Sequence, residues 1–181
     1  MAHDNGQLRV LDAYTYTESV SWQAHDGALQ CLAVAADAQA IVSIGTDRKN
    51  PHPQMRIWRL DAEGQAYSPR ILTQTKLQHG PHAAAVSVID VDSQLSFVAA
   101  GFEDGKVLLL RDVASVAAEG GQPRAKVVRD VSHADELGQE EVPDRVNGLA
   151  LVEAGERLQL LIATTSKTLR YTVLGLSLIH I

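Results

Sequence analysis

The sequence predicts an all-β protein, a partial β-propeller with about three four-stranded blades plus part of an earlier blade. Short segments rich in branched residues, bounded by Gly, Pro, Asp or Asn, follow one another along most of the 181 residues. The order strand, turn, strand, turn, strand then recurs three times, and repetition of this kind is typical of propellers and other repeat folds. Long amphipathic stripes with caps at both ends, which would indicate helices, are not found.

The three repeats give the order of the predicted elements. They span residues 29–60, 86–110 and 146–173, and each consists of three strands joined by two turns. Their first strands start 57 and 60 residues apart, more than the roughly 40 to 45 residues of a compact propeller repeat. We assign the excess to three long polar loops, at residues 48–54, 114–122 and 132–144.

Further strands complete these units. A fourth strand fits at residues 70–75 after the first repeat and at 124–131 after the second, which gives blades of four strands. The last repeat has no clear fourth strand. The run from Asn5 to Leu11 matches residues 104–110, with Gly6 equivalent to Gly105. We therefore expect it to be the third strand of an earlier blade that lacks its first two strands, with an outer strand at residues 19–24.

Two segments carry a weak helical signal. Residues 33–40 are rich in alanine, and residues 113–118 have the composition of a single helical turn. Neither is long enough to present an amphipathic stripe with caps. We expect both to be sheet edges and loops.

Composition excludes several classes of protein. The chain has 16 Lys and Arg against 22 Asp and Glu, so its net charge of -6 argues against a nucleic-acid binder. The single cysteine, Cys31, excludes an internal disulfide and a multi-thiolate zinc site. The N-terminus lacks the features of a secretory signal, and the longest run without charged residues, 77–89, falls short of the roughly 20 that span a membrane. A soluble, intracellular protein is expected.

The sequence gives only weak signals for metal, catalytic or ligand-binding sites. His79 and His82 form the closest histidine pair but have no further ligand nearby. The turn Glu103–Gly105 lacks the carboxylates of a calcium loop, and no nucleophile elbow or phosphate loop is present. The acidic run of residues 132–144, with Asp135, Glu136, Glu140 and Glu141, is expected to be a solvated loop. No catalytic residue, metal, cofactor or small-molecule substrate is predicted.

Two sets of residues resemble known families. Gly45-Thr-Asp47 followed by Arg56-Ile-Trp58-Arg-Leu60 resembles the WD40 signature, although Arg59 replaces the usual Asp after the Trp. A longer ordered set resembles the family of vacuolar protein sorting-associated protein 11 over about residues 4–174. It comprises Asn5–Leu11, Trp22–Ala24, Val42–Asp47, Asn50-Pro51, Arg56–Leu60, Ala99–Val107, Val146–Leu151 and Ala163–Thr165.

This resemblance implies a non-enzymatic scaffold, a fragment of a core subunit of the HOPS and CORVET tethering complexes. The implied partners are other tethering subunits, and the implied place is the cytoplasmic face of late endosomes and of the lysosome or vacuole, with indirect membrane association. The family's α-solenoid and RING zinc domain are not part of this sequence. Two alternatives stay open, a generic WD40 interaction adaptor in another pathway and a propeller enzyme with a central-channel site.

The repeats indicate the roles of single residues, and the extent of the resemblance and the composition of the C-terminus indicate the boundaries. We expect residues 1–174 to be the propeller part and residues 175–181 to be a non-native tail that resembles adapter read-through. A genuine short apolar tail is the alternative. Trp22 is expected to pack in the core, with a role as partner contact as the alternative. Trp58, Leu109 and Tyr171 are taken as equivalent core positions of the three repeats, and Asp90 and Asn147 are expected on inner strands. The structural repeat residues are Gly6, Gly45, Asp47, Trp58, Gly101, Asp104 and Gly105.

Overall fold

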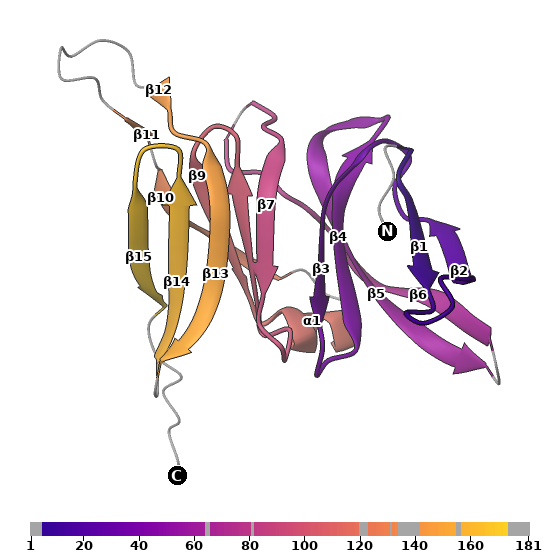
Figure 1. Ribbon diagram of the computed structural model, residues 1–181. Helices are drawn as coiled ribbons and strands as arrows, with labels where there is room; N and C mark the ends of the chain where they lie inside the picture. The colour runs from indigo at the N-terminus through magenta and orange to yellow at the C-terminus, as the bar shows by residue number, and fades with distance from the viewer. Residues whose placement is uncertain are drawn as a thin grey trace.

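The computed structural model is built from β-sheets that stand side by side in sequence order (Figure 1). It describes residues 5–63, 66–80, 82–119, 123–130, 132–133, 142–154 and 157–173. We call the two-stranded sheet at the N-terminus the leading hairpin, and the three larger sheets the first, second and third blades.

The leading hairpin pairs β1 (Gln7–Leu11) with β2 (Glu18–Gln23). The first blade has the order β3 (Leu29–Ala35), β4 (Ala40–Asp47), β5 (Asn50–Glu63) and β6 (Ala66–Lys76). The second blade has β7 (Val86–Val91), β8 (Phe97–Phe102), β9 (Lys106–Arg111) and β10 (Arg124–Asp130). The third blade has β13 (Val146–Ala154), β14 (Arg157–Thr164) and β15 (Thr168–Val173). The remaining elements are α1 (Val113–Glu119) and a short pair, β11 (Ser132–His133) with β12 (Val142–Pro143).

The innermost strands β3, β7 and β13 lie next to one another. Side chains on these strands bond to the backbone of a neighbouring blade. The Val86 amide donates to Gln30 Oε1 at 3.1 Å, Ser87 Oγ donates to the Val146 carbonyl at 2.6 Å, and the Leu151 amide donates to Asp90 Oδ2 at 2.6 Å. These bonds fix each blade against the next at the inner side of the array.

The core lies between blades, because alternate residues of each strand face opposite neighbours. Val42, Ile44 and Ile57 of the first blade pack with Phe102 and Leu110 of the second. On the other face of the second blade, residues from β8 and β9 pack against the third blade in a separate cluster, with Ala99, Val107, Leu109, Leu160 and Ile162 among its buried members.

The all-β prediction and the propeller-like blades are confirmed. The first and second blades have four strands each, and β2, β6 and β10 lie where outer strands were expected. The third blade shows three strands within the part of the chain that the structure describes. Residues 134–141, which hold most of the acidic run, and the tail at 175–181 lie outside the described residues.

Three local expectations were wrong. Residues 132–144 were expected to be a loop, but Ser132–His133 pairs with Val142–Pro143 as β11 and β12. Residues 113–118 were expected to be loop, but they lie in helix α1, which buries Val113 and Ala117 one turn apart. Residues 50–54, expected in a polar loop, are the start of β5, with Asn50 opposite Asp47 and Gln54 opposite Gly45. Pro51 and Pro53 are tolerated because pairing with β6 begins only at Gln54, and because they lie at the register shift that interrupts the ladder with β4.

Candidate functional site: a buried polar network and an apolar groove

A chain of hydrogen bonds runs through the buried face of the first blade toward the leading hairpin. Trp58 Nε1 on β5 donates to Ser43 Oγ on β4 at 2.9 Å, and the same oxygen lies 2.9 Å from His25 Nε2. His25 and Ser43 are fully buried, and Trp58 is 8% exposed. Trp58 Nε1, Ser43 Oγ and His25 Nε2 thus bond to one another in an otherwise apolar layer, whereas His25 Nδ1 is buried without a hydrogen-bond partner.

An ion pair extends this network to the chain segment that enters the blade. Arg56 Nη2 donates to Asp47 Oδ2 at 2.8 Å, and Arg56 Nη1 donates to the carbonyl of Ala24. Asp47 also accepts from the Asp26 amide at 3.3 Å and lies 4.0 Å from His25 Nδ1. The turn between β4 and β5 is therefore tied to the loop that precedes β3.

His25 is held in its neutral form. Burial and, to a smaller extent, the nearby Arg56 charge lower the pKa of this imidazole to about 4, against the opposing effect of Asp47. Because His25 and Ser43 have no exposed surface, a substrate has no access to them. The network resembles a catalytic arrangement only in its residue types, and its geometry suits a structural role.

The predicted glycines are required for two different reasons. Gly6 and Gly105 precede β1 and β9 with φ of +79° and +84°, which glycine adopts at no steric cost. Gly45 and Gly101 leave room for neighbours: an added Cβ would lie 2.6 Å from His25 Cγ at the first and 2.5 Å from Val146 Cγ1 at the second. Asp104 supports its turn by accepting from the Lys106 amide at 3.2 Å.

Strand register corrects one equivalence. Trp58 lies opposite Ile41, and the matching pairs of the other blades are Leu110 with Val98 and Tyr171 with Leu160. Leu110, rather than Leu109, therefore occupies the Trp58 place, and Leu109 faces the third blade. Successive side chains of a strand point to opposite faces of the sheet. An alignment that is wrong by one residue therefore assigns a side chain to the wrong interface.

Trp22 packs as the sequence suggested. Its ring meets Trp58 edge to face, with centroids 5.7 Å apart, beside the buried Leu8 and Ala24. The indole Nε1 of Trp22 is buried and has no hydrogen-bond partner. Its role as a partner contact stays a prediction.

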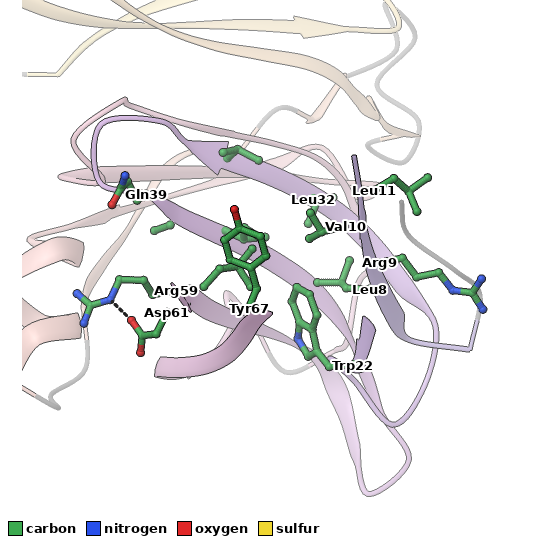
Figure 2. A pocket seen from close by; sticks show the side chains of 14 residues that line it. Leu8, Arg9, Val10, Leu11, Trp22, Leu32, Gln39, Arg59, Asp61 and Tyr67 are labelled. Atoms are coloured by element: carbon green, nitrogen blue, oxygen red, sulfur yellow. Dashed lines mark hydrogen bonds and ion pairs between the residues drawn. The ribbon is translucent and has the colours of Figure 1, made fainter. Parts of the chain in front are cut away.

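An open groove of about 880 Å³ lies between the leading hairpin and the first blade. Figure 2 shows Leu8, Val10 and Trp22 on one side of it and Tyr67 with the Arg59–Asp61 pair on the other. The groove lining also includes Leu32 and Val34 of β3, which are 39% and 62% exposed. Apolar side chains of this size are seldom left uncovered next to one another.

The tip of the leading hairpin carries two exposed tyrosines. Tyr14 is 92% and Tyr16 is 77% exposed. Asp12 Oδ1 accepts from the amides of Tyr14 and Thr15 at 2.9 and 2.8 Å, and these bonds lower the pKa of Asp12. The tip is thus ordered by its own hydrogen bonds while both rings stay available for contact.

Within the described residues no group of three or more His, Cys, Asp or Glu side chains is placed to hold a metal ion. His79 instead packs on Phe102 with ring centroids 4.2 Å apart, and its Nε2 lies 3.6 Å from Asp104. Asp90 and Asn147 lie on the inner strands β7 and β13, as expected. The described helix is too short to cross a membrane.

Sequence reasoning missed His25 and Ser43. Ser43 is a polar residue on β4, the strand that pairs with the strand of Trp58. It lies two positions from Ile41, which is directly opposite Trp58, and this was the signal available in the sequence. The signal for His25 was its place just before the first strand of a repeat, where His79 precedes the second.

Comparison with known proteins agrees with this architecture. Two solved propellers superpose on nearly the whole chain: the C-terminal WD40 domain of Sif2 (TM-score 0.62, 14% identity, 96% of this chain and 42% of that one) and the Cps50 (Swd1) β-propeller domain of Myceliophteria thermophila (TM-score 0.60, 12% identity, 94% and 49%). At these identities the likeness establishes the fold alone, a partial WD40-like propeller.

Sequence relatives and a family model agree on the family of this chain. The vacuolar protein sorting-associated protein 11 homologs of Mus musculus and Homo sapiens are each 29% identical over 138 residues. The match covers 75% of this chain and only 13% of the relatives' length. The family model described as PEP5/VPS11 N-terminal matches residues 1–177. Since that match spans nearly the entire sequence, the chain belongs to the PEP5/VPS11 N-terminal family of vacuolar sorting proteins.

Proposed function

We propose that this chain is a non-enzymatic scaffold, part of the propeller of a core subunit of the HOPS and CORVET tethering complexes. In this role it serves vesicle-mediated protein transport and membrane fusion. The observation that carries the proposal is the family match over residues 1–177, together with curated relatives named as vacuolar protein sorting proteins.

The geometry supports a positional role. The blades are joined by buried apolar layers and by bonds between inner strands, and the His25–Ser43–Trp58 network ties β4 and β5 of the first blade to the segment before β3. A rigid body of this kind offers its loops and outer strands as fixed contact area, and affinity then comes from many dispersed contacts. The fully buried histidine and serine fit a framework better than a reaction centre.

The proposed partners are the other subunits of the tethering complexes. The ordered hairpin tip with Tyr14 and Tyr16 is one surface suited to them, since tyrosine supplies large contact area at low entropic cost. Trp22 is a second candidate contact. Association with late endosomes and with the lysosome or vacuole would be peripheral and would depend on those subunits, on the cytoplasmic side.

Reconstitution tests the proposal. The full-length protein is co-expressed with the defined subunits of HOPS or CORVET, and the assembly is measured by size-exclusion chromatography with mass determination. We expect stoichiometric complexes, and we expect Tyr14→Ser with Tyr16→Ser to weaken at least one subunit contact while Thr17→Ser, on the same tip, does not. Failure of the folded full-length protein to join either complex would favour a generic WD40 adaptor in another pathway.

Membrane placement has its own test. In cell fractionation, the tagged full-length protein is expected with lysosomal or vacuolar membranes and is expected to be released by washing at alkaline pH. Recovery in the cytosol alone, when the other subunits are present on membranes, would contradict the proposed location.

A further inference from the structure

The first and second blades each carry two arginines directly opposite each other on their two outer strands. In the first blade Arg59 on β5 lies opposite Arg70 on β6, and in the second blade Arg111 on β9 lies opposite Arg124 on β10. The two pairs hold equivalent places, since Arg59 and Arg111 each lie opposite the first residue of the second strand of their blade. Opposite side chains point to the same face of a sheet, where like charges repel, so each pair gains from an anion placed between its guanidinium groups.

In the first blade the chain supplies this anion itself. Asp61 Oδ1 accepts from Arg59 Nε at 3.0 Å, and Asp61 Oδ2 accepts from Arg70 Nε at 2.6 Å. A single carboxylate thus bridges both guanidinium groups with charge-assisted hydrogen bonds. Asp61 can do so because β5 continues as a strand for two residues beyond Arg59.

The second blade has no carboxylate in the corresponding place. The residue two positions after Arg111 is Val113, which is buried in helix α1. In the part of the chain that the structure describes, no Asp or Glu forms an ion pair with Arg111 or Arg124. We call Arg111 and Arg124 the open arginine pair, because the described residues supply it with no counter-charge.

The surroundings hold the open arginine pair in position and leave it accessible. The Cζ atom of Arg111 lies over the Phe97 ring, 6.0 Å from its centroid, and Arg111 Nε has no hydrogen-bond partner among the described residues. Arg124 is exposed. Cations on edge strands often prevent self-pairing, but Arg111 lies on β9, which is paired on both sides. That role therefore does not explain the pair.

We propose that the open arginine pair binds an acidic side chain, Asp or Glu, in an extended segment of a partner protein. The carboxylate takes the place that Asp61 has in the first blade, with one oxygen toward each guanidinium group. A protein segment is favoured because β10 pairs only with β9 among the described residues, so its outer edge offers main-chain groups beside Arg124. Lys126, two residues along the same face of β10, is also exposed. Acidic residues at alternate positions of the segment match this spacing.

Peptide binding to the intact full-length protein gives the first test. The probe is a fluorescent peptide in which Glu and Thr alternate, four of each, and the reference peptide has Gln in place of Glu. We expect Arg124→Gln to weaken binding of the Glu peptide by about 10-fold at low salt. The matched control is Arg70→Gln, at the equivalent position that Asp61 already neutralises, and it should leave the affinity unchanged. Equal affinity for both peptides, or equal effects of both substitutions, would overturn the proposal.

Two further measurements identify other occupants. If Arg124→Gln weakens binding to vesicles of phosphatidylcholine with phosphatidylserine and leaves peptide binding unchanged, the pair serves a membrane surface and the proposal is wrong. If the peptide binds only after the four carboxylates at residues 135–141 are changed to amides, the acidic run of the chain itself occupies the pair, and the proposal is again wrong. Because no tethering subunit takes part, these results can refute the acidic-segment site while membership of the tethering complexes stands.

Charge reversal gives the second test and needs no probe. In the free full-length protein, Arg124→Glu replaces repulsion from Arg111 by attraction and should raise the thermal midpoint of the propeller by roughly 1 to 2 °C at low salt. The rise should shrink as added salt screens the charges. Arg70→Glu breaks the bridge through Asp61 and should lower the midpoint. A lower midpoint for Arg124→Glu would show that the chain itself already neutralises the open arginine pair, and would overturn the proposal.

Discussion

The first and second blades each place a histidine against the same point of their second strand, with different surroundings. In the first blade the ring of His25 fits over Gly45 and joins Ser43 and Trp58 by hydrogen bonds. In the second blade the ring of His79 packs on Phe102, which stands in the place of Gly45.

The remaining partners differ in the same way. Ala100 and Leu110 stand where Ser43 and Trp58 stand in the first blade. Both blades keep the same strand pairing and bury these positions. The comparison teaches that backbone pairing defines the blade, while its interior is completed either by a hydrogen-bonded polar network or by apolar packing.

The largest expected effect comes from Trp58→Ala. It removes a buried ring from the interface with the leading hairpin and should destabilise the intact propeller by about 3 to 5 kcal/mol. Leu110→Ala in the second blade should cost about 2 to 5 kcal/mol by packing alone. Denaturant titration measures both. A loss below about 1 kcal/mol for Trp58→Ala would contradict the placement of this strand.

The second expected effect is a pH dependence of stability, which His25 of the first blade causes. Its pKa is about 4 in the folded state against 6.5 when unfolded, so between these values the unfolded chain binds more protons. The contribution of His25 to the free energy of unfolding should therefore be fully present above pH 6.5. It should fall by about 3 kcal/mol as pH drops toward 4. Thermal unfolding across this range measures it, and His25→Gln should flatten the curve relative to the parent. An unchanged slope in that variant would exclude His25 as the cause.

A smaller effect is expected from Ser43→Ala. It leaves Trp58 Nε1 and His25 Nε2 without their partner in a buried site and should cost about 1 to 3 kcal/mol. Ser115→Ala, on the exposed side of helix α1, is the control and should cost less than about 0.5 kcal/mol. If the two variants melt alike, the network contributes nothing to stability.

The smallest expected effect concerns a turn of the second blade. Gly105→Val places a Cβ at a φ of +84° and should destabilise by roughly 1 kcal/mol or more. Gly80→Ala is the control, since an added Cβ there meets only the far end of Lys106 at 4.0 Å. Matching melting temperatures for Gly105→Val and the parent would show that this hairpin is wrongly assigned.

Much of the fold could be predicted because strand patterns and turn residues are local. The outer strands β2, β6 and β10 were found from runs of alternating and branched residues, and Gly6 was matched to Gly105 by the residues that follow each. Helix α1 was missed because seven residues carry too little periodicity. Its stability comes from the burial of Val113 and Ala117 against other parts of the chain.

The candidate site was less predictable because it depends on contacts between distant residues. His25, Ser43 and Trp58 are separated by 18 and 15 positions. Strand register brings Ser43 and Trp58 together, and the path of the segment before β3 brings His25 to them. Leu110 illustrates the same difficulty for prediction from sequence. A shift of one residue in the alignment of the repeats decides which interface a side chain enters. Asp47 and Trp58, by contrast, were visible from a local motif.

The bonds between inner strands have a consequence for how this protein can change over evolution. Each joins one side chain to a backbone group: Gln30 to Val86, Ser87 to Val146, and Asp90 to Leu151. The backbone partner is the same for almost any amino acid, so only one residue of each pair is constrained. Mutations at Val86, Val146 or Leu151 that preserve packing leave these links intact. At these links, adjacent blades can therefore diverge in sequence without having to change together.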